Sequence, residues 1–368
     1  MKLRHVIALI PFAAACSNEE PTAPDLSPRY ARPSGGSQTA ITPIQLGNLK
    51  QINCTQTSAY SINDAVPSTV GGYCVRNGDF RPYLWSAAAS KVLANTGMVR
   101  AVALDGSGFG EMDFKPFKWQ PNGSTVMLPL PDGRPWGTVY EVNADGTAAY
   151  GNSQWQEGNN GLAESAAWSF DGSSWSLSNP GFSPSDLTPS GLIAAGGNAG
   201  HAARWTLSAG TWSAEALPDD GALSSAALGI NQDGSVLSGR IERPNSADPT
   251  KTHFEPVVWV SNGTGGWTLM HLGGLNIVEG SAVSVSTQTN GTVVAVGEAW
   301  EDLPGSNSQL WAVAWKLPVG ASEFDAPTRL SPITRGVSAW ATDINSHGEI
   351  VGSSYTKTTI VAVMWKLQ

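Results

Sequence analysis

The stretch that decides the fold is Ser338-Ala-Trp-Ala-Thr-Asp-Ile-Asn-Ser-His-Gly-Glu-Ile-Val-Gly352, followed after a polar gap by Ile360-Val-Ala-Val-Met-Trp365. Two alternating apolar runs meet at the turn of residues 345–348, and a third run ends on Trp365. Alternation of apolar and polar residues is typical of half-buried strands, and Asn and Gly between such runs favour a tight turn. The stretch therefore predicts three antiparallel strands.

The same pattern recurs along the chain, which indicates a repeat protein. In each unit an apolar run leads into an Asn, Asp or Gly turn, a second run ends in Gly, and a third run ends in Trp. The closing tryptophans, 34 to 56 residues apart, are Trp85, Trp119, Trp168, Trp205, Trp259, Trp315 and Trp365. Because they occupy one repeated position, we expect them to pack between neighbouring units as core residues.

A fourth strand follows the Trp in several units. There an Asn-Gly or Asp-Gly pair precedes another short apolar run, as at Asn122-Gly123, Asp171-Gly172 and Asn262-Gly263. These dipeptides favour hairpins because both central residues of the turn need positive φ. Seven units of four antiparallel strands predict an all-β, seven-bladed β-propeller, with the Ile-Asn or Leu-Asn run nearest the axis.

The last unit lacks its outermost strand, because the chain ends just after Trp365. At the other end, residues 42–49 (Thr-Pro-Ile-Gln-Leu-Gly-Asn-Leu) form a lone strand of the outermost type before the first unit. We expect this N-terminal strand to complete the seventh blade and so close the ring, because radial closure is how propellers protect their strand edges.

The units resemble the HAF repeat of extracellular bacterial proteins over about residues 42–368. The resemblance lies in Leu46-Gly47, in Ile344-Asn345-Ser-His-Gly-Glu-Ile-Val-Gly352 and in His201-Ala-Ala-Arg-Trp205, although no unit has the complete His-Ala-Phe. The repeat is structural, so the resemblance implies no defined activity and no catalytic residues.

Residues 1–16 have a basic start, an apolar run over residues 6–15 and then Cys16. The apolar run is too short to span a bilayer, and the combination is typical of a secretory signal peptide. Cys16 directly after Ala13-Ala-Ala15 resembles the lipobox of bacterial lipoproteins, in which that Cys is lipidated and becomes the mature N-terminus. Ala13 stands where the lipobox usually has Leu. The alternative is ordinary cleavage near Ala15.

Residues 17–41 are rich in Pro, Ser and Gly and lack apolar periodicity. Such a segment cannot bury enough surface to fold, so we expect a disordered tether that spans on the order of 25–30 Å. It would hold the propeller of residues 42–368 off a membrane to which the lipid on Cys16 attaches it. We therefore expect an exported lipoprotein of the outer membrane or cell surface, or alternatively a secreted protein.

The charge balance argues against a nucleic-acid partner. Removal of the signal peptide takes away Lys2 and Arg4 and no acidic residue, which leaves 19 Lys and Arg against 30 Asp and Glu and a net charge of −11. The bases are not clustered, and phosphate binding needs grouped Lys and Arg.

Two cysteines, Cys54 and Cys74, remain once Cys16 is assigned to the lipid. In an exported protein an isolated pair indicates a disulfide, the alternative being two free thiols. Blade topology places both cysteines on the same rim of the ring.

No motif for catalysis is present. The four histidines of the mature chain are scattered over different units, without HExxH spacing, and there is no G-x-S-x-G elbow or P-loop. We therefore name no catalytic residue and expect no metal ligand and no cofactor.

Long loops between the second and third strands point to a binding surface. From the Gly to the Trp the separation is 9 residues in units two and four, but 17, 20 and 18 in units three, five and six. Long loops on a rigid scaffold are where binding residues gather. The rim that carries these loops gives a predicted binding set, which consists of Trp155, Glu157, Arg240, Arg243, Trp300, Glu301 and Asp302.

A Trp beside acidic residues suits stacking on a sugar or contact with a partner protein, unless these side chains only cover the loops. We therefore predict a monomeric, surface-anchored module that binds a glycan or a protein. One alternative is a hydrolase or lyase acting on extracellular polysaccharide, which needs two carboxyl groups about 5–10 Å apart. Another is a purely structural component of the cell envelope.

Overall fold

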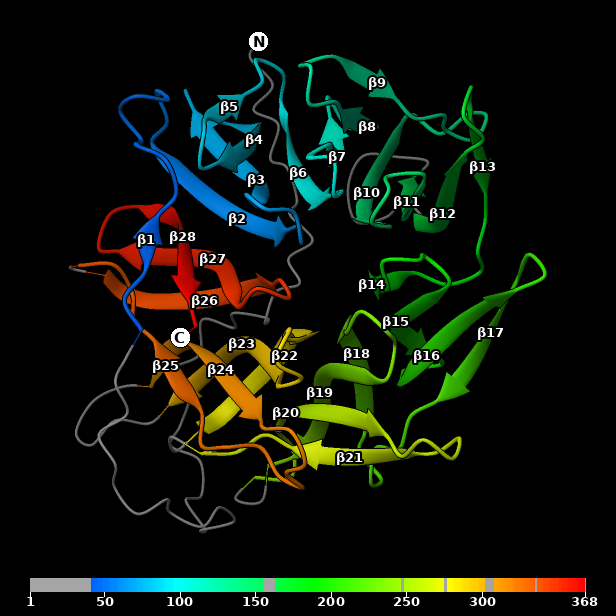
Figure 1. The fold of residues 1–368 in the computed structure, drawn as a ribbon, viewed down its shortest axis with the longest axis vertical. Coiled ribbons are helices and arrows are strands. Elements are labelled where there is room, and N and C mark those ends of the chain that lie inside the picture. The colour runs from blue at the N-terminus through cyan, green and yellow to red at the C-terminus, as the bar shows by residue number, and fades with distance from the viewer. Residues whose placement is uncertain are drawn as a thin grey trace.

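The computed structural model describes residues 41–154, 163–245, 248–274, 277–301, 308–334 and 336–367. Their strands form seven antiparallel sheets of four strands each, arranged in a ring (Figure 1). Within these ranges no helix is long and apolar enough to cross a membrane. The fold is the seven-bladed β-propeller that the repeats predict.

Each blade runs from an inner strand a to an outer strand d, and blades 1 to 7 follow chain order. The a strands are β2 (Gln56–Ile62), β6 (Gly97–Val102), β10 (Trp136–Val142), β14 (Pro184–Leu187), β18 (Ser224–Ile230), β22 (Ile277–Thr287) and β26 (Gly336–Ile344). The b strands are β3 (Thr69–Arg76), β7 (Gly108–Met112), β11 (Ala148–Gln154), β15 (Ile193–Asn198), β19 (Val236–Pro244), β23 (Val293–Glu301) and β27 (Glu349–Thr356).

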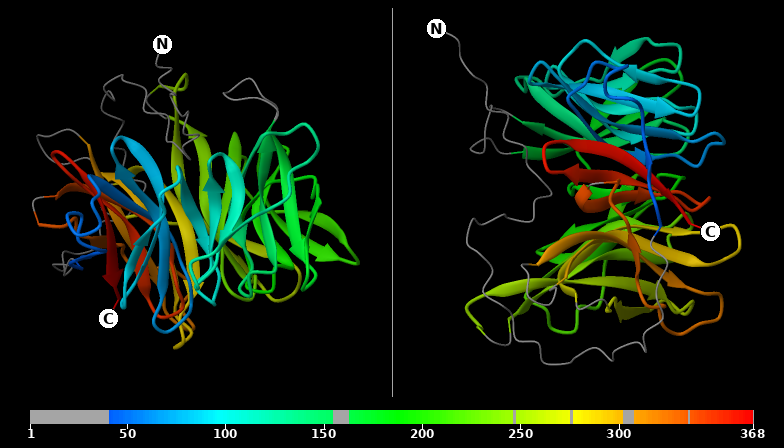
Figure 2. Two further views of the ribbon diagram at one scale, coloured as in Figure 1. Left: turned by 90° about the horizontal axis from the view of Figure 1, so that it is seen from above. Right: turned by 90° about the vertical axis from the view of Figure 1, so that its left-hand side faces the viewer.

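The outer half of each blade consists of strands c and d. The c strands are β4 (Asp79–Ser86), β8 (Lys115–Trp119), β12 (Ala163–Phe170), β16 (His201–Ser208), β20 (Thr252–Ser261), β24 (Gln309–Leu317) and β28 (Ile360–Lys366). The d strands are β5 (Ser90–Val92), β9 (Thr125–Met127), β13 (Trp175–Ser178), β17 (Thr211–Ala216), β21 (Trp267–His271), β25 (Thr328–Leu330) and β1 (Ile44–Gln45). The side views in Figure 2 show the blades standing next to one another around the ring.

Strand β1 completes blade 7 and closes the ring. Its two residues pair with Met364 and Val363 of β28. The backbone N–H of Leu46 then donates to the carbonyl oxygen of Ala362 at 2.9 Å, and the Leu46 side chain is completely buried. The predicted closure by residues 42–49 is confirmed, with only two residues of that segment in strand conformation.

Every a strand carries a β-bulge at the same position. In every blade strand b has a Gly opposite the residue that precedes the bulge, and in blade 4 this is Gly196. A Cβ atom on Gly72 would lie 1.9 Å from the carbonyl oxygen of Ser58, and one on Gly297 would lie 1.9 Å from that of Ser281. No side chain fits there, which explains the Gly of the repeat. A bulge also re-aims a side chain, here toward the axis.

The Asn of the repeat holds the turn between strands a and b and also reaches the next blade. The Asn345 side-chain oxygen accepts from the backbone N–H of Glu349 at 3.0 Å, and its amide donates to the carbonyl of Asn63 in blade 1 at 3.1 Å. Asn63 in turn donates to the carbonyl of Ala103 in blade 2 at 2.7 Å. Blade 4 has Thr188 at this position and still forms four strands.

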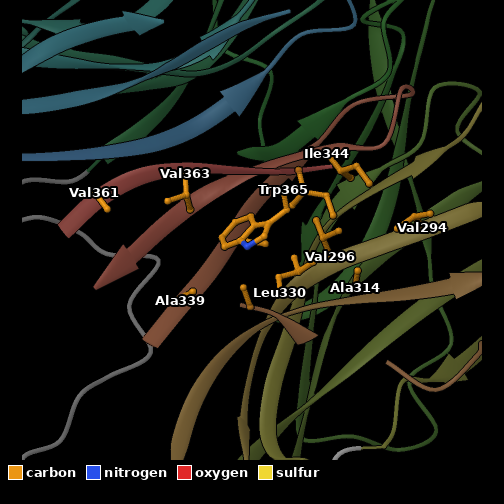
Figure 3. Packing of buried hydrophobic residues seen from close by; sticks show 12 residues of the cluster. Val294, Val296, Ala314, Leu330, Ala339, Ile344, Val361, Val363 and Trp365 are labelled. Atoms are coloured by element: carbon orange, nitrogen blue, oxygen red, sulfur yellow. The ribbon is translucent and has the colours of Figure 1, made fainter. Parts of the chain in front are cut away.

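Most closing tryptophans lie in the core between blades. Among the largest fully buried side chains are Trp168, Trp259, Trp315 and Trp365. The Trp365 indole N–H donates to the carbonyl of Ser331 in blade 6 at 2.8 Å, and its ring packs near Leu330 (Figure 3). Blades 3 and 5 make the same bond to the preceding blade. Trp85 and Trp205 are only half-buried, so the predicted core position is shallower there.

A disulfide joins Cys54 and Cys74, as the isolated pair predicts, with a Cα–Cα distance of 5.8 Å. Cys54 lies in the linker between β1 and β2, and Cys74 lies in β3. The bond therefore fastens the closing segment to blade 1, next to the buried side chain of Tyr83.

The closure can be tested with two substitutions in neighbouring positions. Leu46→Ala should lower the free energy of unfolding by about 2–5 kcal/mol, because it empties a buried site between the two ends of the chain. Ile44→Ala is the matched control: that side chain is 59% exposed, so we expect a loss below about 0.5 kcal/mol. Denaturant unfolding measures both. Deletion of residues 42–49 should unfold the ring, and full stability after the deletion would refute the closure.

Candidate functional site

Four residues of the predicted binding set are described by the structure. Arg240 and Arg243 lie in β19 of blade 5, and Trp300 and Glu301 lie in β23 of blade 6. Trp155, Glu157 and Asp302 lie outside the described residues. The set is thus placed on the rim of two adjacent blades, where strands b end.

Glu301 has a structural role. Its side chain is 4% exposed and forms an ion pair with Arg329 of β25. The Arg329 guanidinium lies 5.1 Å from the ring centre of Trp311 in β24. The Glu301 carboxylate therefore fastens the outer strands of blade 6 to strand b and is not free for a ligand.

Arg243 belongs to a group that we call the histidine cluster, formed with His253, Glu255 and His271. The Glu255 carboxylate lies 3.1 Å from His253 Nε2, 3.4 Å from His271 Nδ1 and 3.7 Å from Arg243 Nε. Hydrogen bonds from the two histidines hold the pKa of Glu255 well below its usual range, and the bond to Glu255 raises the pKa of His271. The histidines look scattered in the sequence, but neighbouring strands bring these two together.

The histidine cluster also holds the linker between β17 and β18. The Arg243 guanidinium donates to the carbonyl oxygen of Asp220 at 2.9 Å, and His271 Nε2 lies 3.5 Å from the Asp220 carboxylate. Through these contacts the charged groups of the histidine cluster hold the junction of blades 4 and 5 together. No group of three or more His, Cys, Asp or Glu side chains within the described ranges is arranged to hold a metal ion.

A better candidate for a reactive site is formed by Glu279 and Glu298 of blade 6, which we call the acid pair. Glu279 of β22 is the direct cross-strand partner of Trp300 in β23, and Glu298 pairs with Ser281. The two carboxyl-bearing residues are therefore diagonal neighbours on one face of the sheet, with Cβ atoms separated by roughly 7–8 Å or slightly less. Both glutamates and Trp300 are half-buried, so part of each side chain remains accessible.

Burial and neighbouring charges act on both groups of the acid pair. Burial raises the pKa of Glu298, the positive charge of Arg240 opposes the rise, and the negative charge of Glu279 adds to it. Burial also raises the pKa of Glu279, while His253 and Arg240 lower it. Arg240 itself lies against a ring, with its guanidinium carbon 4.1 Å from the ring centre of Phe254.

Sequence reasoning did not single out the acid pair. Glu279 and Glu298 belong to no motif, and their diagonal placement depends on strand register, including a shift between residues 277 and 279. One signal was present: Glu298 directly follows the repeated Gly297 and precedes Trp300 by two positions, which predicts a common face.

Acidic residues also surround the axis of the ring, where the bulges point. A cavity of about 120 Å³ there is lined by Glu141, Asp186 and Asp343, among others. Asp343 accepts the backbone N–H of Ile62 in blade 1 at 2.9 Å and the hydroxyl of Ser284 in blade 6 at 2.8 Å. Asp186 accepts an N–H from blade 5 in the same way. These aspartates join neighbouring blades, so we assign them a structural role.

Burial raises the pKa of Asp343 to about 6, against the hydrogen bonds from Ile62 and Ser284 that lower it. Burial and the charge of Asp343 also raise the pKa of Asp186, and burial and the charge of Asp186 raise that of Glu141. An unfolded Asp has a pKa of about 3.9. The stability that Asp343 contributes is therefore present below about pH 4 and is lost as the pH rises through about 6.

Asp343→Asn removes this titration. The free energy of unfolding of the variant minus that of the wild type should increase by on the order of 2–3 kcal/mol as the pH rises from about 4 to about 7.5. Denaturant unfolding at several pH values measures the difference. Asp79→Asn, at a side chain that is 54% exposed, is the control and should show no such trend. If the difference in the free energy of unfolding between wild type and Asp343→Asn does not change with pH, the raised pKa of Asp343 is contradicted.

Comparison with known proteins identifies the fold. No protein-family model matches the chain, and no curated protein matches it. Among solved structures it is similar to an oligogalacturonate lyase from Vibrio parahaemolyticus, with a TM-score of 0.54 and 11% identity over 90% of this chain and 99% of that one. An oligogalacturonate lyase in complex with manganese gives 0.52 and 11% over 91% and 99%. A Pyrococcus horikoshii acylaminoacyl peptidase gives 0.50 and 9% over 88% and 53%. At these identities the likeness establishes a shared fold and nothing finer.

Proposed function

We propose that this chain is an enzyme that cleaves polysaccharide, with the acid pair as its reactive groups. The observation that carries the proposal is the diagonal placement of Glu279 and Glu298 on one face of blade 6, with Trp300 directly across from Glu279. Glycosidases use two carboxyl groups about 5–10 Å apart. Diagonal neighbours have Cβ atoms roughly 7–8 Å apart or slightly less, from which two Glu side chains can bring their carboxyl groups to that spacing. An aromatic ring beside the pair supplies an apolar platform for a sugar.

The environments of the two carboxyl groups suggest their roles. Glu298 is raised in pKa by burial and by the charge of Glu279, so it keeps its proton to a higher pH and can protonate the leaving oxygen. Burial raises the pKa of Glu279 too, but there His253 and Arg240 both oppose the rise. The charge of Glu279 adds to the rise at Glu298, so of the two groups we assign Glu279 as the base or nucleophile. General acid and base catalysis by such a pair contributes roughly 10²–10⁴-fold each.

The shared fold supports a polysaccharide substrate. Two of the solved structures that share the fold are oligogalacturonate lyases, so this scaffold carries enzymes that act on saccharide chains. Either hydrolysis or elimination fits the acid pair, and both require a proton donor at the leaving oxygen. The reaction type is decided by the product, since only elimination leaves an unsaturated sugar.

A non-catalytic module that binds a glycan is the second candidate. It is favoured by the aromatic and cationic groups on the same rim, namely half-buried Trp300 and Arg240 stacked on Phe254. Such a surface would hold a sugar chain without cleaving it. Trp300→Ala should weaken glycan binding under both proposals, whereas only an enzyme loses turnover when a carboxyl group is removed.

Glu298→Gln and Glu279→Gln should each reduce cleavage by at least about 10²-fold while leaving substrate affinity within about threefold. The assay incubates the soluble domain with a panel of neutral and uronate-containing polysaccharides. It measures new reducing ends and the ultraviolet absorbance of unsaturated products. In the wild type, activity should fall as the pH rises through the pKa of Glu298, because the proton donor is lost.

Glu323→Gln, at an exposed position of the same blade, is the matched control and should retain full activity. Absence of products from every polysaccharide, together with tight binding of one of them, would favour the non-catalytic module. Unchanged activity in both acid-pair variants would remove these residues from the reaction.

We also propose that the protein is exported and anchored through a lipid on Cys16, as the N-terminal sequence suggests. A chain attached in this way would act on polysaccharide outside the cytoplasm. Cys16→Ser should abolish incorporation of labelled palmitate and release the domain into the soluble fraction, while Cys54 and Cys74 stay paired. Labelling that persists in the variant would contradict the anchor.

A further inference from the structure

A second cavity lies at the outer edge of blade 1, away from the acid pair of blade 6. Its volume is about 580 Å³, which is within the range of small-ligand pockets, roughly 300–1,000 Å³. It is lined by the linker after β1, by the end of β3 and by the turn between β4 and β5. Its lining includes Asn48, Gln51, Arg76 and Trp85.

The cavity lies at the closure of the ring, where Trp85, like Trp119, Trp205 and Trp315 at other junctions, donates no hydrogen bond to the preceding blade within the described ranges. In blades 3, 5 and 7 the closing Trp donates its indole N–H to a carbonyl just after strand d of the preceding blade. At the closure the corresponding segment bends at Gly47, with φ of 75°, and the Gly47 carbonyl accepts from the Gln45 side chain instead. Trp85 is left half-buried, and its indole N–H has no partner among the described residues.

Amide groups and one guanidinium surround this Trp. Arg76 Nε donates to the carbonyl of Asn53 at 3.2 Å, and one terminal nitrogen donates to the carbonyl of Ile52 at 2.6 Å. These two bonds fix the guanidinium on the linker, while its remaining nitrogen is unoccupied by any described residue. Asn48 and Gln51 are exposed, and the Gln51 side chain makes no hydrogen bond in the described part of the chain.

The charge of the cavity is opposite to that of the whole chain. None of the described lining residues is acidic, and Arg76 contributes a positive charge, with Lys50 next to Gln51 in the linker. The chain as a whole has a net charge of −9. A planar guanidinium suits a carboxylate, and an indole face suits the apolar face of a sugar ring.

We propose that this cavity binds a sugar ring that bears a carboxylate, that is, a uronic acid unit of a polysaccharide. The exposed part of the Trp85 indole contacts the sugar ring while the rest packs on the core, Arg76 pairs with the carboxylate, and the amides of Asn48 and Gln51 bind hydroxyl groups. The site does not depend on the acid pair, since the two lie on different blades. It would hold an acidic polysaccharide on the protein whether or not the rim cleaves it.

The test follows Trp85 directly, with protein labelled by 5-fluorotryptophan and the Trp85 fluorine resonance assigned by Trp85→Phe. Tri-galacturonate should shift this resonance, and the neutral trisaccharide maltotriose should not. Gln51→Glu places a negative charge in the cavity and should weaken tri-galacturonate binding by about tenfold or more. Gln51→Ala is the matched control and should weaken it by less than about threefold, because it removes one amide and adds no charge.

Both variants should fold normally, because the Gln51 side chain is exposed and holds nothing in place. Trp300→Ala should leave the Trp85 shift unchanged, which separates this site from the rim. Three results would each overturn the proposal: no shift of the Trp85 resonance with tri-galacturonate, an equal shift with maltotriose, or equal affinity in Gln51→Glu and Gln51→Ala. Loss of cleavage at the acid pair bears on none of these three results.

Discussion

Closure of the ring between blade 7 and blade 1 is the constraint on which the rest of the molecule depends. Strand β1 contributes only two residues to the pairing, so most of the junction consists of contacts between side chains and backbone. Asp343 accepts the N–H of Ile62, Asn345 donates to the carbonyl of Asn63, and completely buried Leu46 fills the space beside β28. Because each blade covers the apolar face of the next, an open junction would expose two such faces at once.

The bulge in each a strand links this architecture to chemistry. It requires Gly in strand b and turns one residue per blade toward the axis, where Asp186 and Asp343 bind the backbone of neighbouring blades. Nearer the rim of blade 6, where β22 carries a second register shift, the same kind of pairing sets Glu279 diagonal to Glu298. In both places carboxyl groups are held by paired strands, so their spacing is fixed by the scaffold, which is what a reactive pair needs.

Local patterns sufficed to predict the blades, because strand alternation, hairpin turns and the spacing of Trp are properties of short segments. They also predicted the closing strand and the disulfide, since Cys54 and Cys74 follow from topology. The acid pair was not predictable in this way, because register shifts decide which residues oppose one another. Nor was the cavity beside Trp85, which depends on how the linker bends at Gly47.

The two-residue strand β1 also determines when the molecule can finish folding. Its partner β28 lies more than 300 positions later, so blade 7 cannot form on a nascent chain until residues 360–366 have left the ribosome. Early blades can form their own hairpins, but their outermost faces stay uncovered and exposed to aggregation during that time. Residues 360–366 therefore decide whether β1 finds its place, and a truncation that removes them should be far more damaging than the number of residues lost suggests.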